Sequence, residues 1–251
     1  INAAATEKPL TINAAKPTPW DVLHVDDAVE AIVRVLHSNH VNPGAMGISY
    51  GEPIQIDAIA EKIVALTRSQ SKIQNISPDP QPVFKMDIAK AEKLLRWPPV
   101  SLTKRLEQFC RFEVAILAAQ DAGIELMKIR GQVISSKEVD GGQLKTEADQ
   151  TAETLVLSRL TNAFPQDRIL AEEAFEANEK SGWDSPASYW AVDALDGTRS
   201  FIEGFDGFCV QLAYISDGVP TIGIIHEPVK GTTIWAIRGS GAYKRLPDFT
   251  D

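Results

Sequence analysis

One short stretch, W-A-V-D-A-L-D-G-T-R-S-F at residues 190–201, constrains this chain more than any other. Its apolar start predicts a strand that carries Asp193 to its end, and a short turn then brings Asp196 close by. Two carboxylates fixed together repel each other unless cations neutralise them. Hard oxygen ligands with room for water suit Mg²⁺, and the carbonyl of Leu195 would add a backbone ligand. This strand end is therefore a candidate magnesium site.

Gly197 and Thr198 follow this carboxylate pair and open a predicted helix. Free N–H groups at a helix start, next to divalent ions, favour a bound phosphate and stabilise the charge that grows during phosphoryl transfer. The alternative is a plain hairpin turn at Asp196-Gly197, which is the better interpretation of a bare D-G pair. The segment 199–204 is too long for a tight hairpin, which favours phosphoester chemistry.

A second acidic pair, Glu172-Glu173, ends the apolar run Ile169-Leu170-Ala171. If this run is a strand beside the Asp193 strand, these acids would complete the metal shell. The alternative is a solvated acidic helix face that also includes Glu176 and Glu179.

Composition predicts a folded protein without a nucleic-acid partner. Hydrophobic residues make up 44% and charged residues 24% of the 251 residues, which allows a real core. The net charge of -9 disfavours nucleic acid, because no Lys/Arg stripe offsets it. Residues 1–112 carry 13 basic and 12 acidic residues, whereas 113–251 carry 12 and 22. This asymmetry predicts two domains, 1–112 and 113–251.

Cysteine usage and the chain ends bear on location. Cys110 and Cys209 have no metal or disulfide spacing, and no apolar run is long enough to cross a membrane. We therefore expect a cytoplasmic protein without a membrane partner. The chain opens on Ile1 with no signal peptide, so we expect a longer parent protein.

Apolar periodicity predicts a helix-rich first part with short strands and a strand-rich second part. The helices expected in the first part span 24–36, 54–66 and 87–97, with a Pro-rich loop at 77–82 and one long or two abutting helices over 102–129. The second part is expected to hold a polar loop at 137–142, a helix from 146 to 160, and strands at 168–171, 189–192, 208–215 and 221–226. Residues 208–237 read as an antiparallel meander.

The first part resembles the C-terminal part of extended short-chain dehydrogenases/reductases, the nucleotide-sugar epimerases and dehydratases. The resemblance lies in D-V-L-H-V-D-D at 21–27, I-S-Y-G-E-P at 48–53, and the helix from Asp87 with W-P-P-V-S-L at 97–102. It would imply NAD chemistry, but the chain has no G-x-x-G-x-x-G and no Tyr/Lys pair for it. Trp20 stands where the family often has a phosphate-binding Arg. We interpret His24 as a core or strand-end histidine, and Asp26 and Asp27 as helix-capping residues.

The second part resembles the inositol monophosphatase family from about Glu113 to Tyr243. The matching pieces are Lys137 with K-T-E-A-D at 145–149, F-P at 164–165 before I-L-A-E-E at 169–173, V-D-A-L-D-G-T at 192–198, and G-S-G-A-Y at 239–243. The D-x-x-D-G-T piece is the hallmark of that family.

This resemblance implies a site and a mechanism. Glu172, Asp193, Asp196 and the Leu195 carbonyl would bind Mg²⁺, with Asp196 bridging two ions. Thr198 and Asp149 would orient and deprotonate the attacking water, while Gly197 and Thr198 hold the phosphate. In-line attack would release inorganic phosphate without a covalent enzyme intermediate. Lys137 would add positive charge nearby, although a plain surface lysine fits equally well.

Departures from the family pattern leave the substrate open. Ala171 replaces the usual Gly, Ala194 the common Pro, and Ser200 the Asn frequent in inositol phosphatases. The run T-R-S-F-I is closer to bisphosphate nucleotidases and histidinol-phosphate phosphatases. The family also takes a further metal-binding Asp from residues beyond position 251, so this site would be incomplete and apolar strands would be exposed.

The fold class expected from both resemblances is an α/β tail of an extended dehydrogenase/reductase fold, followed by an α+β layered half domain. The expected function is a Mg²⁺-dependent phosphomonoesterase acting on a small phosphorylated metabolite: an inositol phosphate, an adenosine bisphosphate or histidinol phosphate. Two alternatives stay open, an NAD-dependent epimerase or dehydratase without its cofactor half, and a non-catalytic fusion fragment. The oligomeric state, including a homodimer, is also open.

Overall fold

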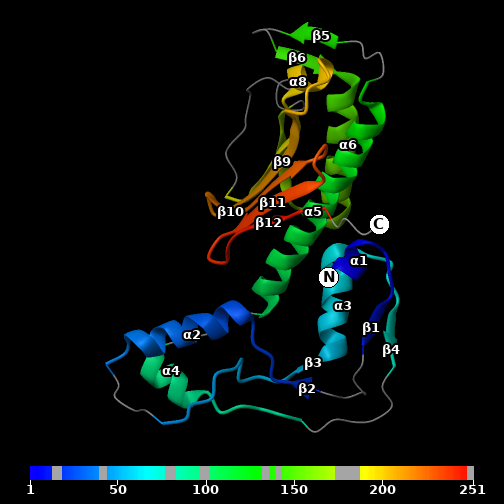
Figure 1. Cartoon of the computed structure of the whole chain (residues 1–251). Helices are drawn as coiled ribbons and strands as arrows, with labels where there is room; N and C mark the ends of the chain where they lie inside the picture. The colour runs from blue at the N-terminus through cyan, green and yellow to red at the C-terminus, as the bar shows by residue number, and fades with distance from the viewer. Residues whose placement is uncertain are drawn as a thin grey trace. The chain divides into compact units, whose positions relative to one another are not determined.

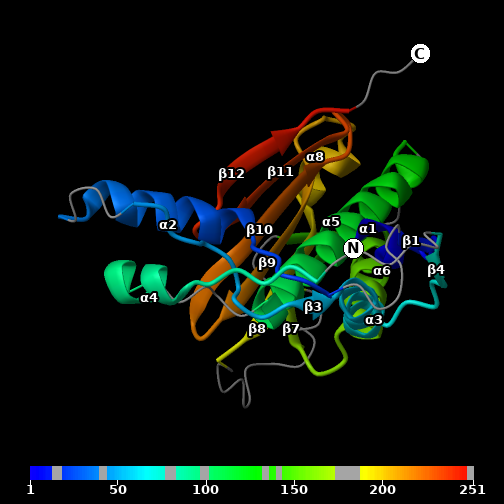
Figure 2. The same cartoon turned by 90° about the horizontal axis from the view of Figure 1, so that it is seen from below.

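The computed structural model describes residues 1–12, 19–39, 44–76, 83–96, 102–131, 136–139, 143–172 and 187–247. The chain forms two compact units, Ile1–Arg111 and Phe112–Asp251 (Figures 1 and 2). No helix within those ranges is both long and apolar enough to cross a lipid bilayer. The Pro-rich loop predicted at 77–82 lies outside the described residues.

The first unit consists of short helices and two small sheets, which confirms the prediction of a helix-rich region with short strands. Its helices are α1 (Asn2–Ala5), α2 (Val25–His37), α3 (Ile56–Thr67) and α4 (Ala89–Leu95). β1 (Leu10–Ile12) pairs parallel with β4 (Ile73–Asn75), and β2 (Pro19–Trp20) pairs antiparallel with β3 (Ile54–Gln55). Ala31 and Ala91 are fully buried, so α2 and α4 can pack closely around Leu95.

Polar side chains hold the start of α2. His24 is the N-cap residue, and its Nδ1 accepts a hydrogen bond from the Asp26 backbone N–H at 3.2 Å. Asp27 is buried in the first turn, where its Oδ1 accepts a hydrogen bond from Arg105 at 2.9 Å. The cap is thus His24, while the two acids occupy the first turn and favour the helix dipole.

Asp21 joins three segments of the first unit through its carboxylate. Oδ1 accepts hydrogen bonds from the Ser49 hydroxyl at 2.5 Å and from the backbone N–H groups of Tyr50 and Gly51, each at 3.0 Å. Oδ2 accepts one from the Met86 N–H at 3.0 Å. Burial raises the pKa of Asp21, but these hydrogen bonds outweigh it and hold the pKa below its ordinary value.

α5 (Leu102–Ile129) is one continuous helix, so the single-helix alternative for this stretch is confirmed. It contains no Pro, and its one Gly is at position 123, where α5 meets the sheet of the second unit. A Cβ at Gly123 would lie 2.6 Å from the His226 ring. The missing side chain therefore lets the helix approach the sheet closely.

The second unit is a six-stranded sheet with order β12-β11-β10-β9-β8-β7. The strands are β7 (Arg168–Ala171), β8 (Tyr189–Asp196), β9 (Cys209–Ser216), β10 (Val219–Glu227), β11 (Thr232–Ile237) and β12 (Gly241–Arg245). β7 runs parallel to β8, and all other neighbours are antiparallel. The predicted strands and the antiparallel meander are confirmed.

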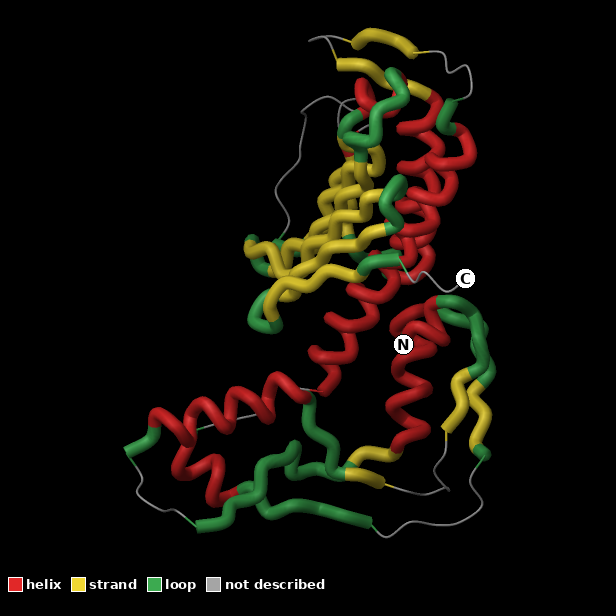
Figure 3. Tube along the Cα trace, viewed as in Figure 1, coloured by secondary structure: helices red, strands yellow, loops and turns green. Residues whose placement is uncertain are grey.

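One face of this sheet packs against α5 and α6 (Glu147–Ala163), as Figure 3 shows. Phe164, at the end of α6, stacks on Trp190 with ring centroids 6.5 Å apart, and Phe112 of α5 meets Trp235 at 5.8 Å. Because side chains alternate along a strand, Ala191 and Asp193 point to the opposite face. The second unit therefore combines a mixed sheet with helices, in line with the layered class that we expected.

The polar loop predicted at 137–142 was wrong in part. β5 (Ser136–Val139) and β6 (Gln143–Thr146) pair antiparallel as a hairpin. Polar residues dominate both strands, so neither shows the apolar alternation that predicts a half-buried strand. The side chain of Lys137, predicted to add positive charge to the site, lies outside the described residues.

Candidate metal and phosphate site

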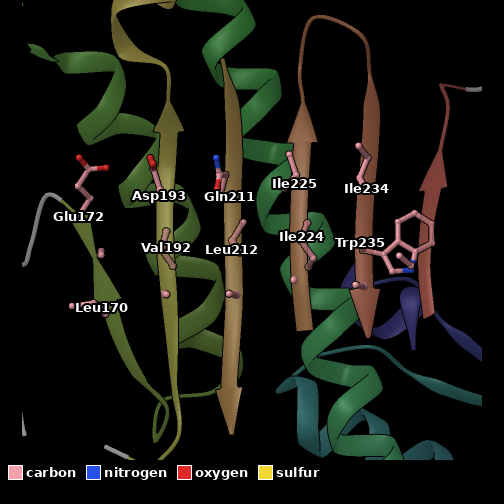
Figure 4. Close-up of a pocket in the computed structure, with 16 residues that line it drawn as sticks. Leu170, Glu172, Val192, Asp193, Gln211, Leu212, Ile224, Ile225, Ile234 and Trp235 are labelled. Atoms are coloured by element: carbon pink, nitrogen blue, oxygen red, sulfur yellow. The ribbon is translucent and has the colours of Figure 1, made fainter. Parts of the chain in front are cut away.

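Glu172 and Asp193 are brought together by parallel pairing of their strands. In the β7–β8 register Ala171 lies opposite Val192, so each acid follows at the same end of its strand. Figure 4 shows both side chains at the same level, beside Gln211 of β9. The requirement that the two apolar runs be neighbouring strands is thus met, while Glu172 itself is exposed and has helical backbone, which the solvated-helix alternative also predicted. The other acids of that alternative lie outside the described residues.

A β-bulge brings Asp196 to this end of the sheet. Asp193 lies opposite Gln211, whereas Asp196 lies opposite Cys209, so β8 has one extra residue between these two pairs. Bulges turn the local strand direction and re-aim side chains. Asp196 is exposed, and its Oδ2 accepts a hydrogen bond from Gln211 Nε2 and a weak one from Cys209 Sγ at 3.6 Å.

The protein supplies little compensation for the charge of Asp193. Within the part of the chain that the structure describes, the donor to its carboxylate is the Leu195 N–H, at 3.2 Å from Oδ1. Burial, the charge of Glu172 and the charge of Asp196 together raise the pKa of Asp193 to about 7. A cation at this point would remove both the repulsion and the shift.

Thr198 and Asp149 form a hydrogen-bonded pair next to these acids. The Thr198 hydroxyl donates to Asp149 Oδ1 at 2.8 Å, and it also lies 3.2 Å from the Leu195 carbonyl oxygen. Asp149 is buried in the first turn of α6, where its Oδ2 accepts from the N–H and hydroxyl of Thr146, both at 2.7 Å. This capping box fixes the carboxylate and leaves Oδ1 for Thr198.

Gly197 allows the sharp turn between the acids and this hydroxyl. It has φ +87°, and a Cβ there would lie 2.4 Å from the Gly207 carbonyl oxygen. α8 (Thr198–Ile202) begins directly after it, so the predicted helix is confirmed and a tight hairpin at Asp196-Gly197 is excluded. Arg130, directly after α5, donates to the Gly204 carbonyl and to Asp206, which holds the loop that follows α8.

Sequence reasoning missed three residues of the site: Thr146, Cys209 and Gln211. Thr146 caps α6, and its spacing of three from Asp149 is a capping signal. Gln211 and Cys209 are polar positions two apart in an otherwise apolar strand, which places both on the face of Asp193. That alternation was the available signal.

The open face of the sheet bears a groove of about 600 Å³. Glu172, Asp193 and Gln211 form its polar end. A row of small residues, paired strand to strand, forms much of the remainder: Ala191, Ala213, Gly223, Ala236 and Ala242. The site is thus accessible from the face opposite the helices.

The donor types fit Mg²⁺, although the acids do not form a complete cage. Among the residues that the structure describes, no three His, Cys, Asp or Glu side chains form a metal-binding cluster. Mg²⁺ commonly takes one or two carboxylates and keeps several waters. Asp193 with Glu172 or Asp196, and the Leu195 carbonyl, meet that need with oxygen donors only.

Comparison with known proteins identifies a family for the second part of the chain. Residues 107–247 match the Inositol monophosphatase family. The chain is 35% identical to the 3'(2'),5'-bisphosphate nucleotidase CysQ of Aggregatibacter actinomycetemcomitans, over 50% of this chain and 46% of the relative. It is 33% identical to inositol monophosphatase 1 of Solanum lycopersicum, over 55% of this chain and 50% of the relative.

Among solved structures, the Thermotoga maritima IMPase shares 29% identity, with a TM-score of 0.48 over 54% of this chain and 51% of that one. The chain thus spans about half the length of the curated relatives that it matches. The family match itself covers more than half of the chain. The chain therefore belongs to the inositol monophosphatase family.

Proposed function

We propose that the second unit carries the metal-binding part of a Mg²⁺-dependent phosphomonoesterase that acts on a small phosphorylated metabolite. One observation carries the proposal: the Thr198–Asp149 hydrogen bond lies beside an acidic cluster that raises the pKa of Asp193 to about 7. A water activator and an uncompensated anionic pocket are what metal-assisted ester hydrolysis needs.

Each residue has a role in this proposal. Glu172, Asp193, Asp196 and the Leu195 carbonyl would hold Mg²⁺. Bound Mg²⁺ would neutralise phosphate oxygens and lower the pKa of a water. The N–H groups of Gly197 and Thr198 would bind the phosphate.

Proton movement follows from the hydrogen bonds. The Thr198 hydroxyl gives its proton to Asp149 Oδ1, so its own oxygen can accept a proton from the attacking water. Asp149 Oδ2 is already occupied by two donors from Thr146, which keeps Oδ1 aimed at Thr198. The water oxygen then bonds to phosphorus while the ester P–O bond breaks. The leaving alkoxide takes a proton from solvent, Asp149 returns its proton to solvent, and inorganic phosphate and the alcohol leave.

The test is Mg²⁺-dependent release of phosphate from inositol phosphate, an adenosine 3',5'-bisphosphate and histidinol phosphate, by a protein that joins this chain to the half of the relatives' length that it does not span. Asp193→Asn should abolish turnover of whichever substrate is accepted. Asp217→Asn is the matched control, because Asp217 lies in the β9–β10 turn, away from the site, and has the φ of 51° that Asn tolerates. Equal turnover in both variants, or no release from any of the three, would contradict the proposal.

We also infer that residues 1–112 form the C-terminal part of an extended dehydrogenase/reductase domain, ahead of the phosphatase-like residues 113–251. What supports this is that Asp21, in the first matching piece, binds Ser49 and Gly51 of the second. The upstream coding sequence tests it. A G-x-x-G-x-x-G and a Y-x-x-x-K in the same reading frame are expected, and their absence would contradict the inference.

A further inference from the structure

Gln211 lies where it can control the metal site without being a metal ligand. It is directly opposite Asp193 in the β8–β9 register, and strand alternation puts both side chains on the open face of the sheet. Figure 4 shows Glu172, just after β7, side by side with Asp193 of β8 and Gln211 of β9. All three border the groove.

The contacts of Gln211 fix which way its amide points. Nε2 donates to Asp196 Oδ2 and to Cys209 Sγ, the latter at 3.5 Å. The opposite amide orientation would bring the Gln oxygen against the Asp196 carboxylate, and a carboxylate can only accept hydrogen bonds. The nitrogen must therefore face Asp196.

A neutral donor has a specific consequence for Asp196. It satisfies one carboxylate oxygen and fixes the orientation of the side chain, yet it leaves the negative charge in place. Lys or Arg at this position would cancel that charge and compete with a metal ion for it. Among the described residues, the contact from Gln211 to the Asp196 side chain is shorter than the one from Cys209 Sγ at 3.6 Å.

We propose that Gln211 is a positioning residue that holds the Asp196 carboxylate in the orientation that binds Mg²⁺. The inference rests on the proposed function and adds a residue to it. Partners that orient metal ligands change metal affinity by about 10- to 100-fold when they are removed.

The test is the affinity of the whole chain for Mn²⁺. Electron paramagnetic resonance measures it, because the signal comes from the free ion. Gln211→Met keeps the length of the side chain and removes the donor, so Mn²⁺ should bind at least about tenfold more weakly. Gln166→Met is the matched control, because Gln166 is exposed in the turn before β7. This variant should bind Mn²⁺ with the affinity of wild type. Gln211→Asn keeps a shorter amide and should bind with intermediate affinity.

The outcomes separate the two proposals. Thermal unfolding in EDTA shows whether Gln211→Met folds, and Gln211→Asn carries the test if it does not. If a folded Gln211→Met or Gln211→Asn variant binds Mn²⁺ as tightly as wild type does, the positioning role is overturned. The proposed function is then left intact. A wild-type chain that binds no Mn²⁺ would overturn both.

Discussion

Asp21 and Asp193 have the same side chain but opposite surroundings. Asp21 receives hydrogen bonds from one hydroxyl and three backbone N–H groups, and its pKa is lowered. Asp193 accepts a hydrogen bond from the Leu195 N–H, faces two other carboxylates, and has its pKa raised to about 7. The first carboxylate is satisfied by the protein itself, whereas the second requires a cation from outside.

This difference separates structural acids from functional ones within a single chain. Donors around Asp21 come from segments distant in sequence, so the carboxylate stabilises the fold of the first unit. The acids around Asp193 cost stability in the absence of a metal ion, and a protein retains such a cluster where binding compensates for it. Asp149 is both a structural and a functional acid, because it belongs to the capping box of α6 and also accepts the Thr198 hydrogen bond.

After Asp193→Asn, we expect the strongest effect on turnover from Thr198→Ala. Removing the hydroxyl breaks the path from water to Asp149, and loss of a general base lowers turnover by about 10²- to 10⁴-fold. The capping box of Asp149 with Thr146 stays intact, so unfolding should change little. Phosphate release measures the loss, and Thr154→Ala on the exposed face of α6 is the control. Unchanged turnover in Thr198→Ala would remove Thr198 and Asp149 from the mechanism.

Asp21→Asn should lower the free energy of unfolding by about 2–4 kcal/mol, because the charge-assisted hydrogen bonds weaken and the new NH₂ group faces donors. Urea denaturation measures the change. Mg²⁺ affinity should be the same as in wild type, since Asp21 belongs to the other unit. A variant as stable as wild type would show that Asp21 is not the structural counterpart of Asp193.

Mg²⁺ affinity should fall as the pH falls through about 7, which is the pKa of Asp193 without metal. Metal binding needs the ionised carboxylate, so the affinity should drop about tenfold per pH unit below that value and level off above it. Calorimetric titrations across this range measure the dependence. A constant affinity would mean that Asp193 is already ionised or is not a ligand.

The sequence was sufficient for the parts of the fold that depend on local periodicity. Helices α2, α3, α5 and α6 and the meander follow from apolar spacing, and the D-x-x-D-G-T stretch located the acids. The β5–β6 hairpin was not predicted from the sequence, because its pairing joins two polar strands. Gln211 was not predicted as a site residue, because its role depends on the β8–β9 register and on the bulge before Asp196. Both are non-local features.

Urea unfolding of wild type and Asp193→Asn, with and without Mg²⁺ at a pH above 7, tests whether the acidic cluster exists for a cation. The pKa of Asp193 is raised from 3.8 to about 7. Ionisation of Asp193 therefore destabilises the metal-free fold, and the free energy of unfolding falls as the pH rises between those two values. Without metal, Asp193→Asn should therefore unfold at a higher urea concentration than wild type. Saturating Mg²⁺ should reverse that order by stabilising only wild type. If Asp193→Asn is less stable in both conditions, or Mg²⁺ stabilises neither protein, the acids are not a metal site and the phosphatase proposal fails.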